Sequence, residues 1–178
     1  VAIAAGYDVA IASSGPAADL ELLAEIVTPG ARAMDARGAA EHGDIVVVAV
    51  PLHKHTTVDA ELLRGKVVID ISNPIDFTTY EQPEALRNSS TALELAKQLP
   101  QDVGVLKAFN ANLADTLISR TNGTTTTTVL FAGDHAEGKI ALTDLLKAAG
   151  LRAVDAGPLQ RSRQLEAIGF LQMVLASS

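Results

Sequence analysis

Two serines and a glycine, Ser13, Ser14 and Gly15, follow a short strand-like segment and precede Pro16. Proline is favoured in the first turn of a helix, so these residues lie where a strand ends and a helix begins. Hydroxyl groups beside a helix N-terminus suit a phosphate, because free backbone N–H groups and the helix dipole favour an anion there. A site for NAD usually has an acidic side chain at this position. The residues therefore predict NADP, although Ser13 and Ser14 could instead serve only as caps of the helix.

Strand-like and helix-like segments alternate along almost the whole chain, which is typical of a mainly parallel sheet covered by helices. The segment DIVVVAV (44–50) is continuous and β-branched, as expected for a strand buried on both faces. Other strands are expected at 8–12, 31–36, 66–72, 102–109, 124–133 and 151–157, and helices at 16–27, 56–65, 90–99, 112–119, 137–150 and 165–175, with an irregular loop at 75–90. We therefore predict an α/β fold: a doubly wound, mainly parallel Rossmann-type sheet with a C-terminal α/β extension.

The opening residues, Val1 to Ala5 followed by Gly6, fit the last turn of a helix and its C-cap. A dinucleotide-binding sheet has a first strand, a Gly-rich turn and a helix before its second strand. We therefore expect about 20 further residues, with the central strand and the pyrophosphate cradle, ahead of this sequence. The alternative is a fold that starts at Val1. On the first interpretation, residues 1–120 form an NADP-binding Rossmann domain that lacks its first strand and Gly-rich turn, and residues 121–178 form a C-terminal extension on the same sheet.

Composition narrows the class of protein. The chain has 178 residues, of which 48% are hydrophobic and only 3% aromatic, so its core must consist of small aliphatic side chains. A net charge of -7 argues against binding to a nucleic acid backbone or an anionic membrane. The sequence has no cysteine, which excludes disulfides, thiolate catalysis and cysteine-bound metals. The longest apolar segment, 45–52, is far shorter than the about 20 residues of a membrane span. We expect a cytoplasmic protein with small-molecule partners.

Four landmarks occur together in one known family. They are DIVVVAVP (44–51), KVVIDISNP (66–74), LKAFN (106–110) and FAGD (131–134) followed by DAGPL (155–159). In this order they resemble the F420-dependent NADP oxidoreductases over nearly the whole chain, and the closing DAGPLQRSRQLEAIGFLQMVLA is the most specific of them. The resemblance implies hydride transfer between NADP(H) and the deazaflavin F420. Relatives in the family also include NADPH-dependent reductases that use flavin and pass electrons to metal ions.

The resemblance bears on the 2′-phosphate site. In the family, a Ser-Arg pair at the end of the second strand binds this phosphate. Ser13 matches the serine, but Ser14 stands in place of the arginine, and a basic residue of some members falls near Ala18. The preference for NADP is therefore expected to be weaker than the family pattern implies. Arg32 and Arg37 could supply the missing charge, although nothing in the sequence places them at this site.

The other cofactor-binding residues that the resemblance implies lie at the carboxyl ends of strands, where open α/β sheets bind ligands. They are Ala49, Val50 and Pro51 along the ribose and nicotinamide, His53 near the mouth of the site, Asn73 and Pro74 beside the nicotinamide ring, and Phe109 and Asn110 facing the second cofactor. Structural alternatives are a strand terminator for Pro51, a turn for Asn73-Pro74, and a core residue and a helix cap for Phe109-Asn110. Gly157-Pro158 and the following helix would form the wall for the deazaflavin, and residues 168–173 serve core or dimer packing, so a homodimer is expected.

Direct hydride transfer needs two stacked rings and the exclusion of water, but no protein nucleophile or strong acid-base pair. We therefore expect no catalytic side chain. We expect no metal site either, since His53 and His55 lie two residues apart and would not share a helix face. Asp70 could belong to the site or bind backbone, and Lys107 could reach a phosphate or be solvated at a strand edge. The rival functions are reduction of a flavin or another small acceptor, and NADP(H) sensing without turnover.

Overall fold

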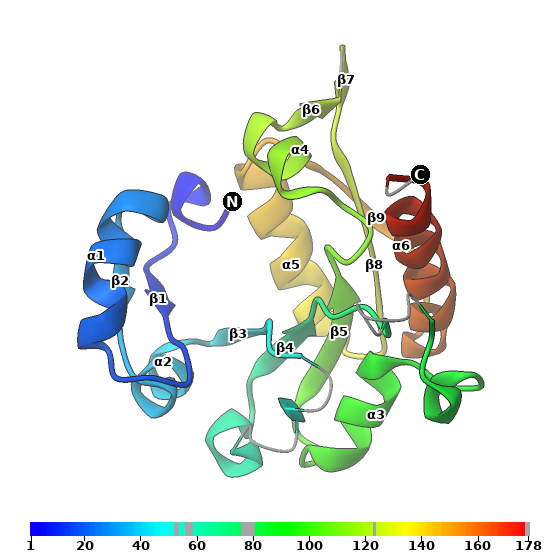
Figure 1. Ribbon diagram of the computed structural model, residues 1–178, viewed down its shortest axis with the longest axis horizontal. Coiled ribbons are helices and arrows are strands. Elements are labelled where there is room, and N and C mark those ends of the chain that lie inside the picture. The colour runs from blue at the N-terminus through cyan, green and yellow to red at the C-terminus, as the bar shows by residue number, and fades with distance from the viewer. Residues whose placement is uncertain (52–53, 56–58, 76–80, 123, 177–178) are drawn as a thin grey trace.

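The computed structural model describes residues 1–51, 54–55, 59–75, 81–122 and 124–176. Its main sheet has five strands in the order β3-β4-β5-β8-β9 (Figure 1). The strands are β3 (Ile45–Val48), β4 (Val67–Asp70), β5 (Gly104–Ala108), β8 (Thr128–Gly133) and β9 (Arg152–Asp155). Neighbouring strands are parallel except for β5 and β8, which are antiparallel. The predicted mainly parallel α/β fold is confirmed.

Helices cover both faces of this sheet. Successive residues of a strand point to opposite faces, so Val68 and Val105 pack with α3 (Thr91–Gln98), whereas Ile69 and Leu106 pack with α5 (Ala136–Ala148). Both hydrophobic clusters consist almost entirely of aliphatic side chains, as the composition predicts. The short η5 (Leu159–Arg161) leads into α6 (Ser162–Ala176), the last helix, which lies on the same face as α3.

A second, two-stranded sheet precedes the main one. Its parallel strands β1 (Val9–Ile11) and β2 (Ala31–Ala33) are connected by α1 (Ala18–Val27), and this unit lies to the left in Figure 1. Ahead of it, η1 (Ile3–Ala5) ends at Gly6, which has a positive φ of 85° and donates its N–H to the carbonyl of Ile3. The predicted C-cap at Gly6 is therefore confirmed, and the residues ahead of it form a single 3-10 turn.

The remaining elements are short. They are α2 (Ala36–His42), η3 (Ala60–Leu63), η4 (Glu84–Leu86), α4 (Ala114–Ser119) and the antiparallel pair β6 (Thr121–Asn122) and β7 (Thr125–Thr126). The helix expected at 56–65 is wrong in its described part, which contains only the 3-10 turn η3. Asp59 caps this turn by accepting from the N–H of Glu61, and the turn stops before Gly65, whose φ is positive. Within the described part of the chain, no helix is long and apolar enough to cross a membrane.

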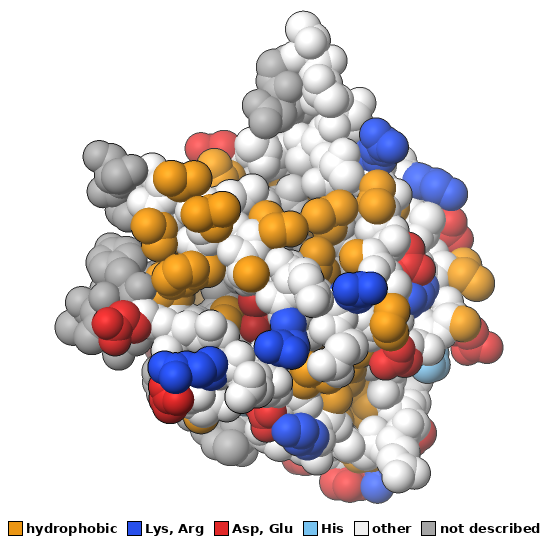
Figure 2. All heavy atoms as spheres, turned by 90° about the vertical axis from the view of Figure 1, so that its right-hand side faces the viewer, with side chains coloured by type: hydrophobic (Ala, Val, Ile, Leu, Met, Phe, Trp, Pro, Cys, Tyr) orange, Lys and Arg blue, Asp and Glu red, His pale blue; other side chains and the backbone are white. Residues whose placement is uncertain are grey.

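Helix α6 exposes apolar side chains on one side. Ile168 and Leu171 are 40% and 58% exposed, one turn apart. Figure 2 shows the face of the molecule on which α6 lies, and hydrophobic side chains gather across it. The opposite side of the helix is buried through Leu165, Glu166 and Gly169, which face the main sheet. The helix therefore has one face toward the core and one apolar face toward solvent.

Candidate cofactor site

Two asparagines meet at the carboxyl ends of neighbouring strands. Asn73 follows β4 and Asn110 follows β5, and the two strands are parallel. Asn73 Nδ2 donates to the backbone carbonyl of Asn110 at 2.9 Å, and Asn110 Nδ2 donates to Asn73 Oδ1 at 3.1 Å. Asn110 Nδ2 also donates to the carbonyl of Leu165 on α6, at 2.8 Å. Both amide groups are thereby held in one orientation at the edge of the sheet where ligands of open α/β folds bind.

The backbone beside this pair is strained. Phe109 has a φ of 62°, in the left-handed region that side-chain-bearing residues rarely adopt. Its carbonyl accepts from the N–H of Asn112 at 3.0 Å, and its ring packs against the cluster under α5. The alternative that Phe109 is a core residue is thus true of its ring, while its backbone turns the chain so that Asn110 faces α6. Strain of this kind costs about 1–3 kcal/mol and is found preferentially at functional sites.

Helix α6 approaches the asparagine pair through a glycine. A Cβ atom at Gly169 would lie 2.7 Å from Asn73 Oδ1, 2.8 Å from the carbonyl oxygen of Asn110 and 3.0 Å from its Nδ2. These distances are too short for any side chain, so the helix can lie here only with glycine at this position. The sequence analysis missed Gly169, although a glycine inside an apolar helical pattern is a signal for close packing.

Residues after β3 reach the same edge. Ser72, next to Asn73, donates its hydroxyl to the carbonyl of Val50 at 3.4 Å and lies 3.2 Å from His55 Nε2. His55 is buried, and burial lowers the pKa of its imidazole, so the ring is neutral at pH 7. Val50 is half-buried. His53 lies outside the described residues.

The remaining predicted positions differ in exposure. Ala49 and Pro51 are exposed next to Val50, beyond the end of β3 at Val48, and the carbonyl of Pro51 accepts from the N–H of Lys54 at 2.8 Å. Pro74 is buried beside Asn73. The structure therefore places the predicted residues that follow β3, β4 and β5 along one edge of the main sheet, and joins Asn73 and Asn110 directly.

The predicted phosphate-binding residues belong to the other sheet. Ser13 and Ser14 are exposed after β1, and Ser13 Oγ accepts from the N–H of Gly15 at 3.2 Å. The alternative that these serines cap the helix is wrong: α1 begins only at Ala18, and its N-cap is Ala17, with no side-chain cap. At the start of the helix, the N–H groups of Asp19 and Leu20 donate to the carbonyls of Pro16 and Ala17, at 3.1 and 2.9 Å.

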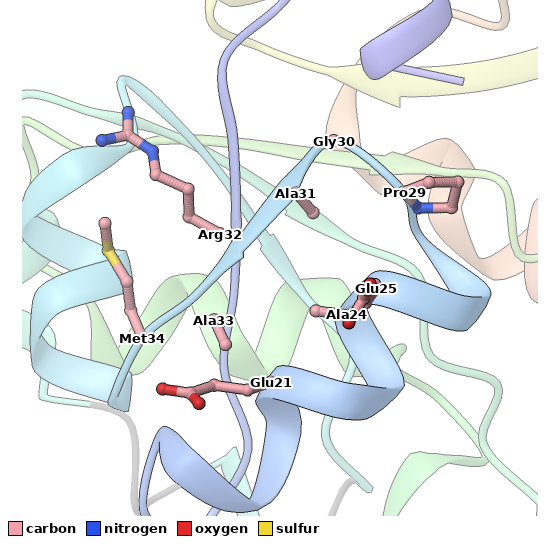
Figure 3. Close-up of a pocket in the computed structure, with 9 residues that line it drawn as sticks. All are labelled: Glu21, Ala24, Glu25, Pro29, Gly30, Ala31, Arg32, Ala33 and Met34. Atoms are coloured by element: carbon pink, nitrogen blue, oxygen red, sulfur yellow. The ribbon is translucent and has the colours of Figure 1, made fainter.

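A pocket of about 530 Å³ opens between α1 and β2 (Figure 3). Glu21 and Glu25 on α1 give it an acidic wall, which does not suit a phosphate. Arg32, at the other side of the pocket, forms an ion pair with Asp8, and Arg37 pairs with Glu41 at 2.8 Å. Both arginines that could supply positive charge to the 2′-phosphate site are therefore engaged by carboxylates.

Two charged residues of β4 and β5 lie beneath the asparagine edge. Asp70 and Lys107 are wholly buried, with Lys107 Nζ 2.9 Å from Asp70 Oδ2, and Lys107 also donates to the carbonyl of Ser72. Both expectations for Lys107 are wrong, because it is neither solvated nor open to a phosphate. Asp70 accepts from the N–H of Ser72 at 2.9 Å, as one alternative predicted. Burial alone would raise the pKa of Asp70, but Lys107 and the hydrogen bonds hold it below its ordinary value.

Comparison with known proteins places these features in context. Residues 1–74 match the family described as NADP oxidoreductase, coenzyme F420-dependent. The F420-dependent NADP reductase of Methanothermobacter marburgensis is 33% identical over 140 residues, which cover 73% of this chain and 61% of that protein. Metalloreductase STEAP3 of Rattus norvegicus is 26% identical over 93% of this chain but only 32% of its own length. The chain thus spans less than two thirds of either relative.

A solved structure confirms the fold. A putative F420-dependent NADP-reductase from Arthrobacter sp. FB24 superposes with a TM-score of 0.80 at 24% identity, covering 96% of this chain and 83% of that one. At this identity the likeness concerns the fold, a Rossmann-like arrangement of sheet and helices.

Proposed function

Because the chain belongs to the F420-dependent NADP oxidoreductase family, we propose that it transfers a hydride between the nicotinamide of NADP(H) and a deazaflavin of the F420 type. The observation that carries this proposal is the reciprocal hydrogen bonding of Asn73 and Asn110 where β4 and β5 end. An asparagine side chain both donates and accepts hydrogen bonds, as the carboxamide of nicotinamide does. A pair with fixed orientation can therefore hold that ring in one position.

The chemistry of this edge suits hydride transfer. When bound, the nicotinamide supplies the hydride, and the protein has only to align the acceptor and exclude water. The nearby Asp70 and Lys107 pair with each other inside the protein and do not offer a nucleophile at the surface of the site. We assign Ala49, Val50, Pro51 and Pro74 to the walls of the nicotinamide site, and Phe109 to the acceptor side.

Ser13, Ser14 and Gly15 are assigned to the 2′-phosphate of NADP. Their fit is partial, because they offer hydroxyl and N–H donors without a free arginine, and Arg32 and Arg37 are paired elsewhere. Hydroxyl donors bind both a phosphate and a sugar hydroxyl, whereas a cation strongly favours the phosphate. A modest preference for NADPH over NADH follows.

The proposal is tested by mixing the purified protein with NADPH and oxidised F420 and following the absorbance of F420. We expect bleaching that is faster with NADPH than with NADH. Binding of NADPH without any bleaching of F420 would contradict the assignment of the acceptor.

The similarity to STEAP3, whose name is metalloreductase, favours one second candidate. In this alternative the same site passes the hydride from NADPH to a flavin. The same assay with FAD and FMN in place of F420 separates the two, since only the true acceptor is reduced at a rate proportional to the protein concentration.

We also propose a homodimer that covers the exposed apolar face of α6. Ile168 and Leu171 are the exposed apolar side chains of this face. Hydrophobic side chains gather on the side of the molecule that Figure 2 shows. Burial of apolar area is the main driving force of stable association.

A further inference from the structure

Four buried side chains from four different elements meet beside the asparagine pair. They are Asp70 of β4, Lys107 of β5, Thr91 at the start of α3, and Glu166 of α6, none more than 2% exposed. Lys107 Nζ lies 2.9 Å from Asp70 Oδ2, 2.8 Å from Glu166 Oε1 and 2.7 Å from Thr91 Oγ1. One cation thus faces two carboxyl groups in a place that water does not reach.

The hydrogen bonds of Thr91 indicate how many protons this cluster holds. Thr91 Oγ1 lies 2.5 Å from Asp70 Oδ2 and 2.6 Å from Glu166 Oε1. Both are distances of short O–H···O hydrogen bonds, but a hydroxyl group has only one proton to donate. The second bond therefore needs a proton that belongs to one of the carboxyl groups. The same proton balances the charge, because it leaves one ammonium beside one carboxylate.

The extra proton belongs to Glu166. Asp70 receives donors on both oxygens, from Lys107 and Thr91 on Oδ2 and from the N–H of Ser72 on Oδ1, as an ionised carboxylate requires. Glu166 Oε2, in contrast, is buried with no hydrogen-bond partner among the described residues, which would be very costly for an anion. Burial also raises the pKa of Glu166, although Lys107 opposes this effect. With Thr91 donating to Asp70 Oδ2, we place the proton of Glu166 on Oε1, directed at Thr91 Oγ1, and the same oxygen accepts from the backbone N–H of Thr91 at 3.0 Å.

This cluster is connected to the asparagine pair through α6 and through β4. Leu165, next to Glu166, is the residue whose carbonyl accepts from Asn110 Nδ2 at 2.8 Å. Gly169, one turn further along α6, lies in contact distance of both asparagines. On the β4 side, Lys107 donates to the carbonyl of Ser72, the residue before Asn73. A displacement of Glu166 would therefore move the groups that orient both amides.

We propose that Glu166 is a positioning residue, which remains protonated and holds α6 against the ends of β4 and β5 so that Asn73 and Asn110 keep their orientation. It acts through α6 and does not touch a cofactor. The assignment of these amides to nicotinamide rests on the proposed function, but the protonation of Glu166 and its effect on the amides do not.

The pH dependence follows from the groups that face Glu166. These are Asp70 from β4, Lys107 from β5 and Thr91 from α3. Loss of the proton at high pH would leave two carboxylates beside one ammonium and would remove the donor to Thr91. Because burial raises the pKa of Glu166 in the folded state, the stabilisation that its proton contributes is fully present below the ordinary glutamate value and is lost as the pH rises through the folded value.

The test is NMR spectroscopy of the full chain with 13C-labelled glutamate and 15N-labelled asparagine side chains. The carboxyl resonance that disappears in Glu166→Gln identifies Glu166, and Glu137→Gln, at an exposed position, is the control for losing one carboxylate. We expect the Glu166 resonance of a neutral carboxyl at pH 7, and a shift of the Asn110 amide resonances only when Glu166 ionises at higher pH. An ionised Glu166 at pH 7 would overturn the proposal.

The variants extend the test to positioning. In Glu166→Gln, which is neutral at every pH, the Asn110 amide resonances should stay near their positions in the unmodified protein and lose their response to high pH. In Glu166→Leu they should move, and the Kd for NADPH should rise by about tenfold. If Glu166→Leu does not fold, the pH response of the Asn110 amide resonances in Glu166→Gln still tests the positioning role. Unmoved amides in a folded Glu166→Leu, or a retained response in Glu166→Gln, would refute the positioning role. Lack of NADPH binding by the unmodified protein would instead contradict the proposed function.

Discussion

The side chains at the two predicted binding regions differ in how firmly they are held. Asn73 and Asn110 are fixed by hydrogen bonds to each other and to α6, so their donors and acceptors are in place before a ligand arrives. Ser13 and Ser14 are exposed, and the N–H of Gly15 donates to Ser13 Oγ at 3.2 Å. The residues of the proposed nicotinamide site are thus held more firmly than those of the proposed 2′-phosphate site.

A substitution at residue 14 tests the proposed 2′-phosphate site. Replacing Ser14 with arginine should lower the Kd for NADPH by about tenfold, because a charge-assisted hydrogen bond to a phosphate contributes about 1.5–3 kcal/mol. Titration calorimetry with NADPH and NADH measures this change. NADH lacks the 2′-phosphate and is the matched control, so an equal gain for both dinucleotides would show that residue 14 does not face the phosphate.

A substitution of Asp70 tests how much its buried ion pair with Lys107 stabilises the fold. Asp70→Asn should destabilise the fold by about 3–5 kcal/mol at pH 7, because it removes the ionised partner of the buried Lys107 and leaves only Glu166, which is protonated in the proposed cluster, beside that charge. Since the pKa of Asp70 is lowered in the folded state, its stabilisation is present at neutral pH and is lost as the pH falls through the folded value. Urea unfolding at a series of pH values should show less loss of stability toward acid in the variant.

Asp102→Asn is the control for this prediction. Asp102 pairs with Arg64 at 3.2 Å on the surface, and exposed pairs of this kind contribute about 0–1 kcal/mol. If Asp70→Asn were no more destabilising than Asp102→Asn, the buried cluster would not stabilise the fold in the way described.

At the scale of elements, the main strands and the last two helices could be predicted from the sequence. Residues 45–50 are apolar and mostly β-branched, and β3 lies within them, but the expected burial on both faces is wrong, because Val47 is 51% exposed. The spacing of apolar residues in 137–150 and 165–175 predicts the helices α5 and α6, because each helix buries one side against the sheet. The ends of elements could not be predicted as well. In the expected helix at 56–65, for example, Asp59 caps the single 3-10 turn η3.

The contacts between elements could not be predicted. Lys107 looks like an exposed strand residue in the sequence, because its partners Asp70 and Glu166 come from distant positions on other elements. The antiparallel pairing of β5 with β8 is likewise a tertiary feature. Asn73 and Asn110 were found through the resemblance, but their mutual hydrogen bonds and the role of Gly169 depend on the packing of α6.

Gly169 tests the packing of this helix on the site. In Gly169→Ala the added methyl group would lie within 2.7–3.0 Å of Asn73 and Asn110, so α6 must shift. We expect a loss of about 1–3 kcal/mol in stability from overpacking, together with weaker NADPH binding. Thermal unfolding and calorimetry measure both effects. Gln164→Ala, at an exposed position of the same helix, should change neither, and an unaltered Kd in Gly169→Ala would contradict the contact.

For the whole molecule, the predicted binding residues are divided between two sheets. Ser13, Ser14 and Gly15 follow β1, whereas Asn73 and Asn110 lie on the five-stranded sheet. The proposed NADP site therefore needs both sheets, and the family match over residues 1–74 includes strands of each. With a net charge of -7, the protein attracts an anionic dinucleotide only through local donors. The boundary at residue 120 between a Rossmann domain and an extension stays a prediction.

The oligomeric state is a property of the same scale. Leu171→Glu should convert the proposed dimer into a monomer, because a carboxylate on the apolar face of α6 would be buried in the interface. Sedimentation velocity measures the mass. Leu22→Glu, at an apolar position of α1 that is 68% exposed against 58% for Leu171, should leave the dimer intact. A monomeric unmodified protein, or a dimer that survives Leu171→Glu, would argue against this interface.

The binding of nicotinamide at the Asn73–Asn110 pair is tested most directly by nuclear Overhauser effects. The measurement uses 15N-labelled protein saturated with NADP+, and detects transfer between the nicotinamide ring protons and the side-chain amide protons of Asn73 and Asn110. We predict effects to both amides. Bound NADP+ whose nicotinamide protons show effects to other residues, and none to this pair, would contradict the assignment of the site.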